Sequence, residues 1–186
     1  MKKLNLIIRG FLYLENWTPN SSQKEIYKPY VQDFRIVEDK YKKLFNLLKK
    51  KYDLKITFCS YTSTPEFIIN YMKNKEYNLH LIPLEKKYQF NHTCDFLKSN
   101  SIKSPTIILR SDLILSDLFI KKLFLIDYYQ INKIVIIGRE PKNKLIDILF
   151  IVPNKFINDI EKTLFNKENG HFIEENKNIK NNIFFM

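Results

Sequence analysis

The sequence predicts a mainly parallel, three-layer α/β fold in which helices cover both faces of one sheet. Two observations carry this prediction. Apolar stretches of strand length alternate with helical patterns along the 186 residues, as in folds built from strand–helix–strand units. The stretch Thr106–Leu109 is continuously apolar, which is typical of a strand buried on both faces. No linker or repeat interrupts the pattern, so we expect a single domain over residues 1–186.

The first half of the chain is expected to start the sheet and to supply helices that cover it. The ranges, in order, are a strand at Leu4–Gly10, a long irregular loop at Phe11–Phe34, a helix at Phe34–Tyr52, a strand at Leu54–Tyr61, a helix to about Lys73, a strand at Tyr77–Pro83 and a helix at Phe90–Asn100. The helix from Phe34 has a broad apolar face, and its lysines and acidic residues are expected on the opposite face. The hydroxyl residues Thr62–Thr64, followed by Pro65, predict an N-cap for the second helix. The loop's aromatic residues indicate a packed lid or a stacking surface, with packing alone as the alternative.

The second half continues the alternation. After the strand at Thr106, Ser116 or Asp117 is expected to cap a helix that runs to about Tyr129. Strands follow at Asn132–Gly138 and Lys144–Pro153, and Asn154 is expected to cap a helix that runs through Phe165. The residues from 166 to 186 are expected to form a polar C-terminal tail.

Composition and charge narrow the classes of protein. A hydrophobic fraction of 45% with 15% aromatic residues excludes a disordered chain, and three glycines leave no Gly-rich phosphate loop. Cys59 and Cys94 match no zinc or disulfide motif, and the apolar strand around Cys59 predicts a buried, reduced thiol. The net charge of +11 would suit a polyanion or a nucleotide phosphate. Because the lysines are scattered through a chain rich in Lys, Asn and Ile, we expect nucleic acid not to be the partner.

Nothing in the sequence predicts a membrane protein. Residues 1–9 superficially resemble a signal peptide, but Asn5 and Arg9 interrupt the apolar run and no cleavage site follows. No apolar stretch approaches the roughly 20 residues of a membrane span. We expect a cytoplasmic protein, in the host cytoplasm if the chain is viral.

Charge appears abruptly where the apolar stretch ends, at Arg110 and Asp112. In open α/β sheets, ligands bind outside the carboxyl ends of the strands. A carboxylate there can hold a divalent cation or a ligand hydroxyl. The plainer alternative is an Arg and an Asp that cap a strand and start a turn, and the two side chains need not act together.

Three segments resemble the nucleotide-binding half of GT-A-type glycosyltransferases, including small bacterial and large-virus enzymes of polysaccharide type. They are Arg110–Leu113 after its apolar strand, the Asp-x-x-Phe strand Ile146–Pro153, and the tail at His171 and Glu174. The resemblance implies a Rossmann-like, nucleotide-sugar-binding fold. It also implies a hexosyltransferase-like enzyme that moves a sugar from a nucleotide-sugar donor to a glycan or other acceptor.

The resemblance further implies which residues bind the donor. In such enzymes an Asp-x-Asp motif binds Mn²⁺ or Mg²⁺ against the diphosphate. Asp112 matches the second Asp, whereas Arg110 stands in place of the first and could pair with phosphate or lock the site by a salt bridge. Together with Ser111, these residues are expected to bind the donor. Arg9 and Gly10 match the place where base and ribose dock, although a turn accounts for Gly10 equally well.

Asp147 is the expected catalytic residue. An Asp in an apolar strand is costly unless it is partnered, and burial raises the pKa of a carboxylic acid. A raised pKa suits a general base that takes a proton from an acceptor hydroxyl. The alternative is a buried Asp bonded to backbone donors or to Arg139. His171 is expected to bind the metal or a phosphate, with a solvated surface histidine as the alternative.

Two other functions stay open at this point. A non-catalytic basic α/β module that binds nucleic acid or a protein partner would gather lysines on one face and would lack a cleft around Asp112. A nucleotidyltransferase would also need carboxylates for a metal, so the missing first Asp counts equally against it.

Overall fold

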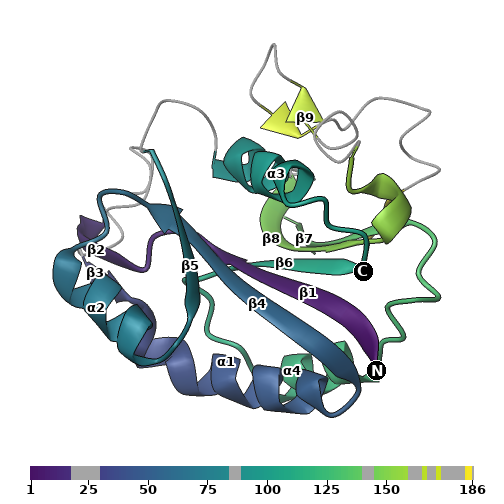
Figure 1. Ribbon diagram of the computed structural model, residues 1–186, viewed down its shortest axis with the longest axis horizontal. Coiled ribbons are helices and arrows are strands. Elements are labelled where there is room, and N and C mark those ends of the chain that lie inside the picture. The colour runs from purple at the N-terminus through teal and green to yellow at the C-terminus, as the bar shows by residue number, and fades with distance from the viewer. Residues whose placement is uncertain are drawn as a thin grey trace.

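The computed structural model describes residues 1–17, 30–83, 89–139, 145–158, 165–166, 171–172 and 183–185. Figure 1 shows the arrangement of its helices and strands. In chain order the elements are β1 (Lys2–Arg9), β2 (Tyr13–Trp17), β3 (Tyr30–Asp33), α1 (Phe34–Lys49), β4 (Tyr52–Tyr61), α2 (Glu66–Asn74), β5 (Asn78–Ile82), α3 (Gln89–Ser99), β6 (Thr106–Arg110), α4 (Asp117–Leu125), β7 (Ile134–Arg139), β8 (Leu145–Val152), the 3₁₀ turn η2 (Asn154–Phe156), β9 (Phe165–Asn166), β10 (His171–Phe172) and β11 (Ile183–Phe185).

Seven of the described strands form one sheet in the order β11-β7-β8-β6-β1-β4-β5, and β2-β3 and β9-β10 form two-stranded sheets. β1 lies parallel to both β4 and β6, β5 is parallel to β4, and β11 is parallel to β7. Only β8 runs against its neighbours within the described sheet. The mainly parallel sheet that the sequence predicts is therefore confirmed.

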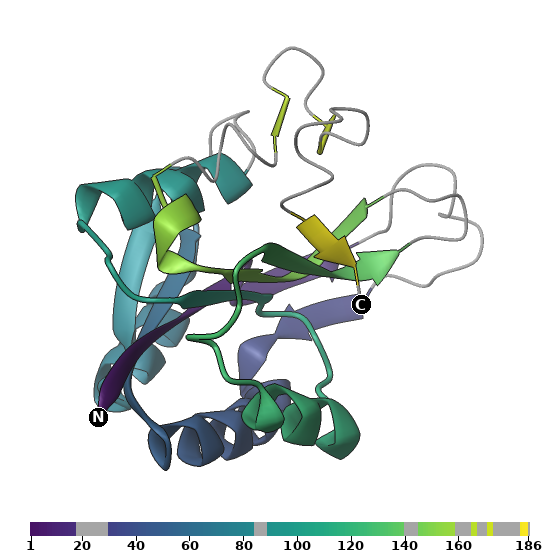
Figure 2. The same cartoon turned by 90° about the vertical axis from the view of Figure 1, so that its right-hand side faces the viewer.

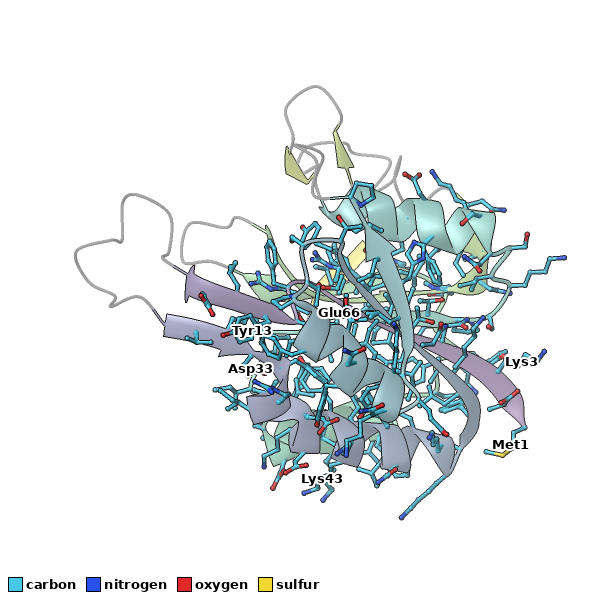
Figure 3. The ribbon with its side chains drawn as sticks, turned by 60° about the vertical axis from the view of Figure 1, so that its left-hand side comes forward. Met1, Lys3, Tyr13, Asp33, Lys43 and Glu66 are labelled. Atoms are coloured by element: carbon cyan, nitrogen blue, oxygen red, sulfur yellow. The ribbon has the colours of Figure 1, made fainter. Side chains whose placement is uncertain are left out.

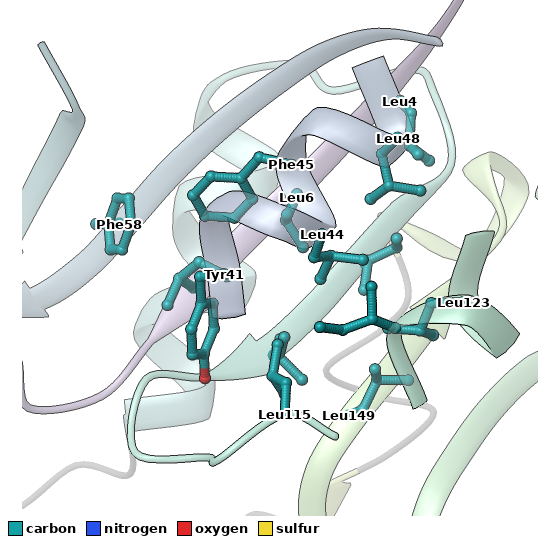
Figure 4. Close-up of a cluster of buried hydrophobic side chains, with 14 of the residues drawn as sticks. Leu4, Leu6, Tyr41, Leu44, Phe45, Leu48, Phe58, Leu115, Leu123 and Leu149 are labelled. Atoms are coloured by element: carbon teal, nitrogen blue, oxygen red, sulfur yellow. The ribbon is translucent and has the colours of Figure 1, made fainter. Parts of the chain in front are cut away.

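Helices cover both faces of this sheet, which completes the predicted three layers. α1 and α4 lie below the sheet in Figures 1 and 2, and α3 lies above it. The larger apolar cluster packs the lower face, and Figure 4 shows side chains from β1, α1 and α4 meeting there. A second cluster, which includes Cys59, Cys94 and Leu97, packs α3 against the upper face. The prediction that Cys59 is buried is confirmed.

The structure corrects the prediction of an irregular loop from Phe11 to Phe34. β2 and β3 pair antiparallel at the two ends of this segment, with Tyr13 opposite Asp33 and Leu14 opposite Gln32. A register shift between Leu14 and Trp17 disturbs the regular pairing, which is one reason why the side-chain pattern does not show a strand. Residues 18–29 lie outside the described part of the chain.

Two helix boundaries also differ from the prediction. The hydroxyl of Thr64 does not cap α2. It donates to the carbonyl of Tyr61 at 2.7 Å and meets the hydroxyl of Ser60 at 3.0 Å, and Pro65 occupies the N-cap position without a side-chain bond. The predicted Ser116 cap of α4 is confirmed, but this helix ends at Leu125 because Ile126 is already extended.

The C-terminal prediction was wrong in its described parts. Residues 154–156 form a 3₁₀ turn and residues 157–158 a further turn, in place of the start of a helix, and residues 159–164 lie outside the described part of the chain. The expected polar tail contains β10, which pairs with β9, and β11, which joins the main sheet beside β7. Strands this short are defined by backbone pairing, so they leave little side-chain periodicity to find. No described helix has the length and apolar character needed to cross a membrane.

Candidate functional site

Two parallel strands, β1 and β6, end side by side at the candidate site, and β4 lies next to β1. Arg9, the last residue of β1, is in register with Cys59 of β4 and with Arg110, the last residue of β6. Backbone bonds continue past these pairs, because the N–H of Gly10 donates to the carbonyl of Cys59 at 3.1 Å and the N–H of Ser111 donates to that of Arg9 at 2.8 Å. The turns after β1 and β6 are thereby held together at the carboxyl edge of the sheet, where ligands bind in open α/β folds.

Gly10 is required by the geometry of this edge. Its φ is +129°, a conformation that L side chains rarely adopt, and an added Cβ would lie 2.6 Å from the hydroxyl oxygen of Ser111. That hydroxyl donates to the carbonyl of Phe11 at 2.8 Å. Gly10 and Ser111 therefore pack the two turns against each other, which gives both residues a structural reason to be where they are.

Further side chains hold the same turns, and the sequence reasoning did not identify them. Gln32 donates through Nε2 to the carbonyl of Phe11 at 2.5 Å, and the hydroxyl of Tyr41 donates to the carbonyl of Arg110. The Phe11 and Tyr61 rings pack with centroids 4.4 Å apart. Burial raises the pKa of Tyr41, so its hydroxyl stays a donor. Figure 4 shows Tyr41 among core side chains. In the sequence it is one residue of the apolar helix face, so nothing distinguishes it from an ordinary core residue.

Arg110 and Asp112 form a two-point ion pair. Nε of Arg110 donates to Oδ1 of Asp112 at 2.9 Å, and Nη2 donates to Oδ2. The side chains of Arg110 and Asp112 are 32% and 19% exposed, so the pair reaches solvent. β6 ends at Arg110 and the chain turns, which brings the carboxylate onto the guanidinium. The two side chains do act together, and the salt bridge that the sequence left as an alternative is present.

The other expected donor-binding residues are less accessible. Arg9 is 3% exposed and Ser111 is 1% exposed, so neither offers a surface to a ligand in this structure. Arg9 lies close to the Cys59 thiol. Burial raises the pKa of this thiol to about 12 and the positive charge of Arg9 offsets part of that effect, so the thiol is protonated at neutral pH and is not a nucleophile.

Asp147 lies in β8, the strand next to β6. β8 runs antiparallel to β6 and pairs Leu149 with Leu109. Continuing this register by two residues carries Asp147 toward the turn at Ser111, although its side chain lies outside the described part of the structure. His171 lies in β10, and its side chain also lies outside the described part.

The described residues do not fit a divalent cation held by protein ligands. No group of three His, Cys, Asp or Glu side chains comes together within the described ranges. The one carboxylate expected to bind the metal, that of Asp112, has both oxygens bonded to Arg110. Hard cations need several oxygen ligands, and Mg²⁺ commonly takes one or two carboxylates along with phosphate and water.

Comparison with known proteins gives a fold and no sequence family. No protein-family model and no curated protein sequence matches the chain. Among solved structures, the whole chain aligns with 86% of a Bacillus anthracis protein assigned as a glucose-1-phosphate thymidylyltransferase, at a TM-score of 0.53 and 10% identity. It also aligns with 88% of the 4-diphosphocytidyl-2C-methyl-D-erythritol synthase of Anaerococcus prevotii, at 0.54 and 11%.

A third structure is a protein of Desulfovibrio desulfuricans assigned as a nucleotide-diphospho-sugar transferase. The whole chain aligns with 80% of it, at a TM-score of 0.54 and 8% identity. At these identities the likeness concerns the fold alone. The chain therefore has the GT-A-like fold of the nucleotide-diphospho-sugar transferases.

Proposed function

We propose that this chain is a transferase that uses a nucleotide-linked sugar and moves the sugar to a glycan or other acceptor hydroxyl. The observation that carries the proposal is the partly exposed Arg110–Asp112 pair at the carboxyl edge of the sheet, in a fold of this type. A guanidinium at that place has the charge opposite to that of a diphosphate, and it can donate paired hydrogen bonds to phosphate oxygens. The leaving nucleoside diphosphate would be stabilised there as its negative charge develops.

Asp147 and His171 keep the roles that are expected of them from the sequence. Asp147 would take the proton from the acceptor hydroxyl, which the course of β8 toward the turn after β6 supports. Gly10 would let the backbone of the first turn lie against Ser111, and this contact would shape the floor of the donor site. His171 would bind a donor phosphate from the C-terminal segment.

The first test is thermal unfolding with a panel of nucleoside diphosphates and nucleotide sugars. A ligand that binds only the folded state adds about 2.7 kcal/mol of stability at 100 times its dissociation constant. We expect one base to raise the melting temperature selectively. If all bases raise the melting temperature equally, or if none raises it, the result would contradict a nucleotide-sugar site.

A nucleotidyltransferase is a second candidate, favoured by the comparisons. Two of the similar structures are named as a thymidylyltransferase and a diphosphocytidyl compound synthase, and the chain spans 86% and 88% of their lengths. The two reactions release different products. A glycosyltransferase converts a nucleotide sugar and an acceptor into a glycoside and a nucleoside diphosphate. A nucleotidyltransferase joins a nucleoside triphosphate to a sugar phosphate and releases pyrophosphate, so assaying both products separates the candidates.

A group of lysines favours the third candidate, a basic binding module. Lys2, Lys3, Lys55 and the run Lys49–Lys51 are exposed at the amino ends of β1 and β4 and the end of α1. Figure 3 shows Met1 and Lys3 at the end of the molecule opposite Tyr13 and Asp33. We call these six residues the amino-edge lysines.

A further inference from the structure

We propose that this chain recognises the diphosphate of its nucleotide ligand through Arg110, held by Asp112, and that this recognition needs no divalent cation. The inference rests on the proposed function, because it concerns the same site and the same class of ligand. It replaces the metal role that the resemblance implied for Asp112 with a positioning role.

The ion pair leaves Asp112 little capacity to bind a cation. Both oxygens of Asp112 accept hydrogen bonds from one guanidinium, so the carboxylate is already neutralised by a fixed positive charge. A cation that bound these oxygens would have to displace Arg110 and lie next to a second positive charge. No described group of three metal-binding side chains compensates for that cost.

Contacts of both its backbone and its side chain hold Arg110 in place. Its backbone lies at the end of a buried strand, and its carbonyl accepts a bond from the buried hydroxyl of Tyr41. Its side chain is 32% exposed, so a ligand at the carboxyl edge can reach it. A planar guanidinium fixed at two points by Asp112 presents a charged donor set in one orientation, and an Arg keeps its charge at every physiological pH.

A site built around a cation and a site built around Arg110 predict opposite effects of metal ions on nucleotide binding. A site built around a cation binds the nucleotide only when the cation is present. A site built around Arg110 binds the free diphosphate best, because Mg²⁺ or Mn²⁺ complexed to the ligand cancels part of the charge that Arg110 attracts. The affinity in EDTA should therefore equal or exceed the affinity in either metal.

The experiment is isothermal titration calorimetry of the full chain with ADP, GDP, CDP, UDP and dTDP, each in EDTA, in MgCl₂ and in MnCl₂. We expect binding of the preferred nucleotide in EDTA. Arg110→Gln should weaken it by at least about tenfold, the loss of one charged hydrogen bond. Arg110→Lys keeps the positive charge but lacks the planar set of donors, so its affinity should lie between those of wild type and Arg110→Gln.

Asp112→Asn separates positioning from metal binding. The amide oxygen can still accept a bond from Arg110, and a negative charge next to the diphosphate is removed. We expect the affinity of this variant in EDTA to stay within about threefold of the wild-type affinity. This change is smaller than the one expected from the loss of a charged hydrogen bond. If Asp112 were a metal ligand, this variant would abolish a metal-dependent signal.

A matched control is available in the Asp33–Arg35 pair at the start of α1. Arg35 also bonds to both oxygens of an Asp two residues away, with Nη2 to Oδ2 at 2.6 Å and Nε to Oδ1 at 3.0 Å. Arg35→Gln breaks the same kind of pair elsewhere and should leave nucleotide binding unchanged. Circular dichroism of every variant establishes that it is folded.

The outcomes separate the two proposals. Binding that needs Mg²⁺ or Mn²⁺ and disappears in EDTA would overturn this inference and leave the proposed function standing. Binding in EDTA that is indifferent to both Arg110 variants would also overturn it. If no nucleotide binds in any arm, the proposed function fails and the inference fails with it.

Discussion

At the scale of single residues, the contact between Gly10 and Ser111 is the tightest constraint on the candidate site. We expect Gly10→Ala to destabilise the fold by at least about 1–3 kcal/mol, because an alanine would have to adopt the positive φ of Gly10, +129°. The clash with the Ser111 hydroxyl adds to this cost. Denaturant unfolding measures the change in the free energy of unfolding.

A double-mutant cycle separates the clash from the backbone strain. Ser111→Ala removes the oxygen that would meet the new Cβ, although it also loses the bond to the Phe11 carbonyl. We expect Gly10→Ala/Ser111→Ala to be less destabilised than the sum of the single variants. If the effects of the two single variants simply add, the turns after β1 and β6 can move apart, which would contradict a tight contact between Gly10 and Ser111.

Cys59 and Cys94 provide a second prediction at this scale. Both thiols are buried, and burial raises the pKa of Cys59 to about 12. A thiol reagent at about pH 8 should therefore modify neither residue in the folded protein, since the thiolate is the reactive form. Both should react in denaturant. Fast modification of either thiol in the native state would mean that α3 separates readily from the sheet.

At the scale of elements, a buried carboxylate joins α1 to α2 and to the segment before β5. Glu38 is 4% exposed and accepts bonds from Tyr71 at 2.6 Å, Tyr77 at 2.9 Å and Lys42 at 2.8 Å. Sequence reasoning assigned the acids of this helix to its solvent face, so the cluster is a finding of the structure. The carboxylate fastens three elements that also pack through apolar contacts.

Replacing this carboxylate should loosen the three elements. We expect Glu38→Gln to lower the free energy of unfolding by about 1.5–3 kcal/mol, the usual value of a charged hydrogen bond. Asp39→Asn is the matched control on the same helix, because Asp39 is exposed and its neutralisation should change stability by less than about 0.5 kcal/mol. Equal effects of the two variants would contradict the structural role of Glu38.

Glu38 also predicts how stability depends on pH. Burial alone would raise its pKa, but the bonds from Lys42, Tyr71 and Tyr77 outweigh burial, so the pKa lies below the ordinary value of 4.5. A depressed pKa in the folded state gives stability that is present above the unfolded value and is lost as the pH falls through the folded value. The difference between wild type and Glu38→Gln should therefore be full near neutral pH and should shrink below about pH 4.5. A difference that is constant down to pH 3 would contradict this assignment.

At the scale of the whole molecule, charge decides between an enzyme with a basic composition and a basic binding module. Lys49→Glu/Lys50→Glu/Lys51→Glu reverses part of the amino-edge lysines, and Lys73→Glu/Lys75→Glu/Lys155→Glu makes the same charge change at other exposed positions. We expect both variants to elute from heparin at similarly reduced salt, because retention would follow net charge. A loss confined to the first variant would favour the binding module.

The same scale shows which features of the fold were predictable. Thr106–Leu109 reveals itself through a continuous apolar stretch, because both faces of this strand are buried. The helix from Phe34 reveals itself through its apolar face. The sequence does not reveal β2, β3 and β11. These strands are short and are defined by backbone pairing with a neighbouring strand, not by a pattern in their own side chains.

The sequence by itself determined the α/β class, the order of most strands and helices, and the position of Arg110 and Asp112 at the end of a central strand. These follow from local patterns of burial, which a short window of residues contains. Only the tertiary structure decided that Arg110 and Asp112 pair, that Tyr41 and Gln32 hold the turns around them, and that Glu38 lies inside. Most of these contacts join residues that are far apart in the chain or depend on a turn geometry, so no local pattern of residue types specifies them.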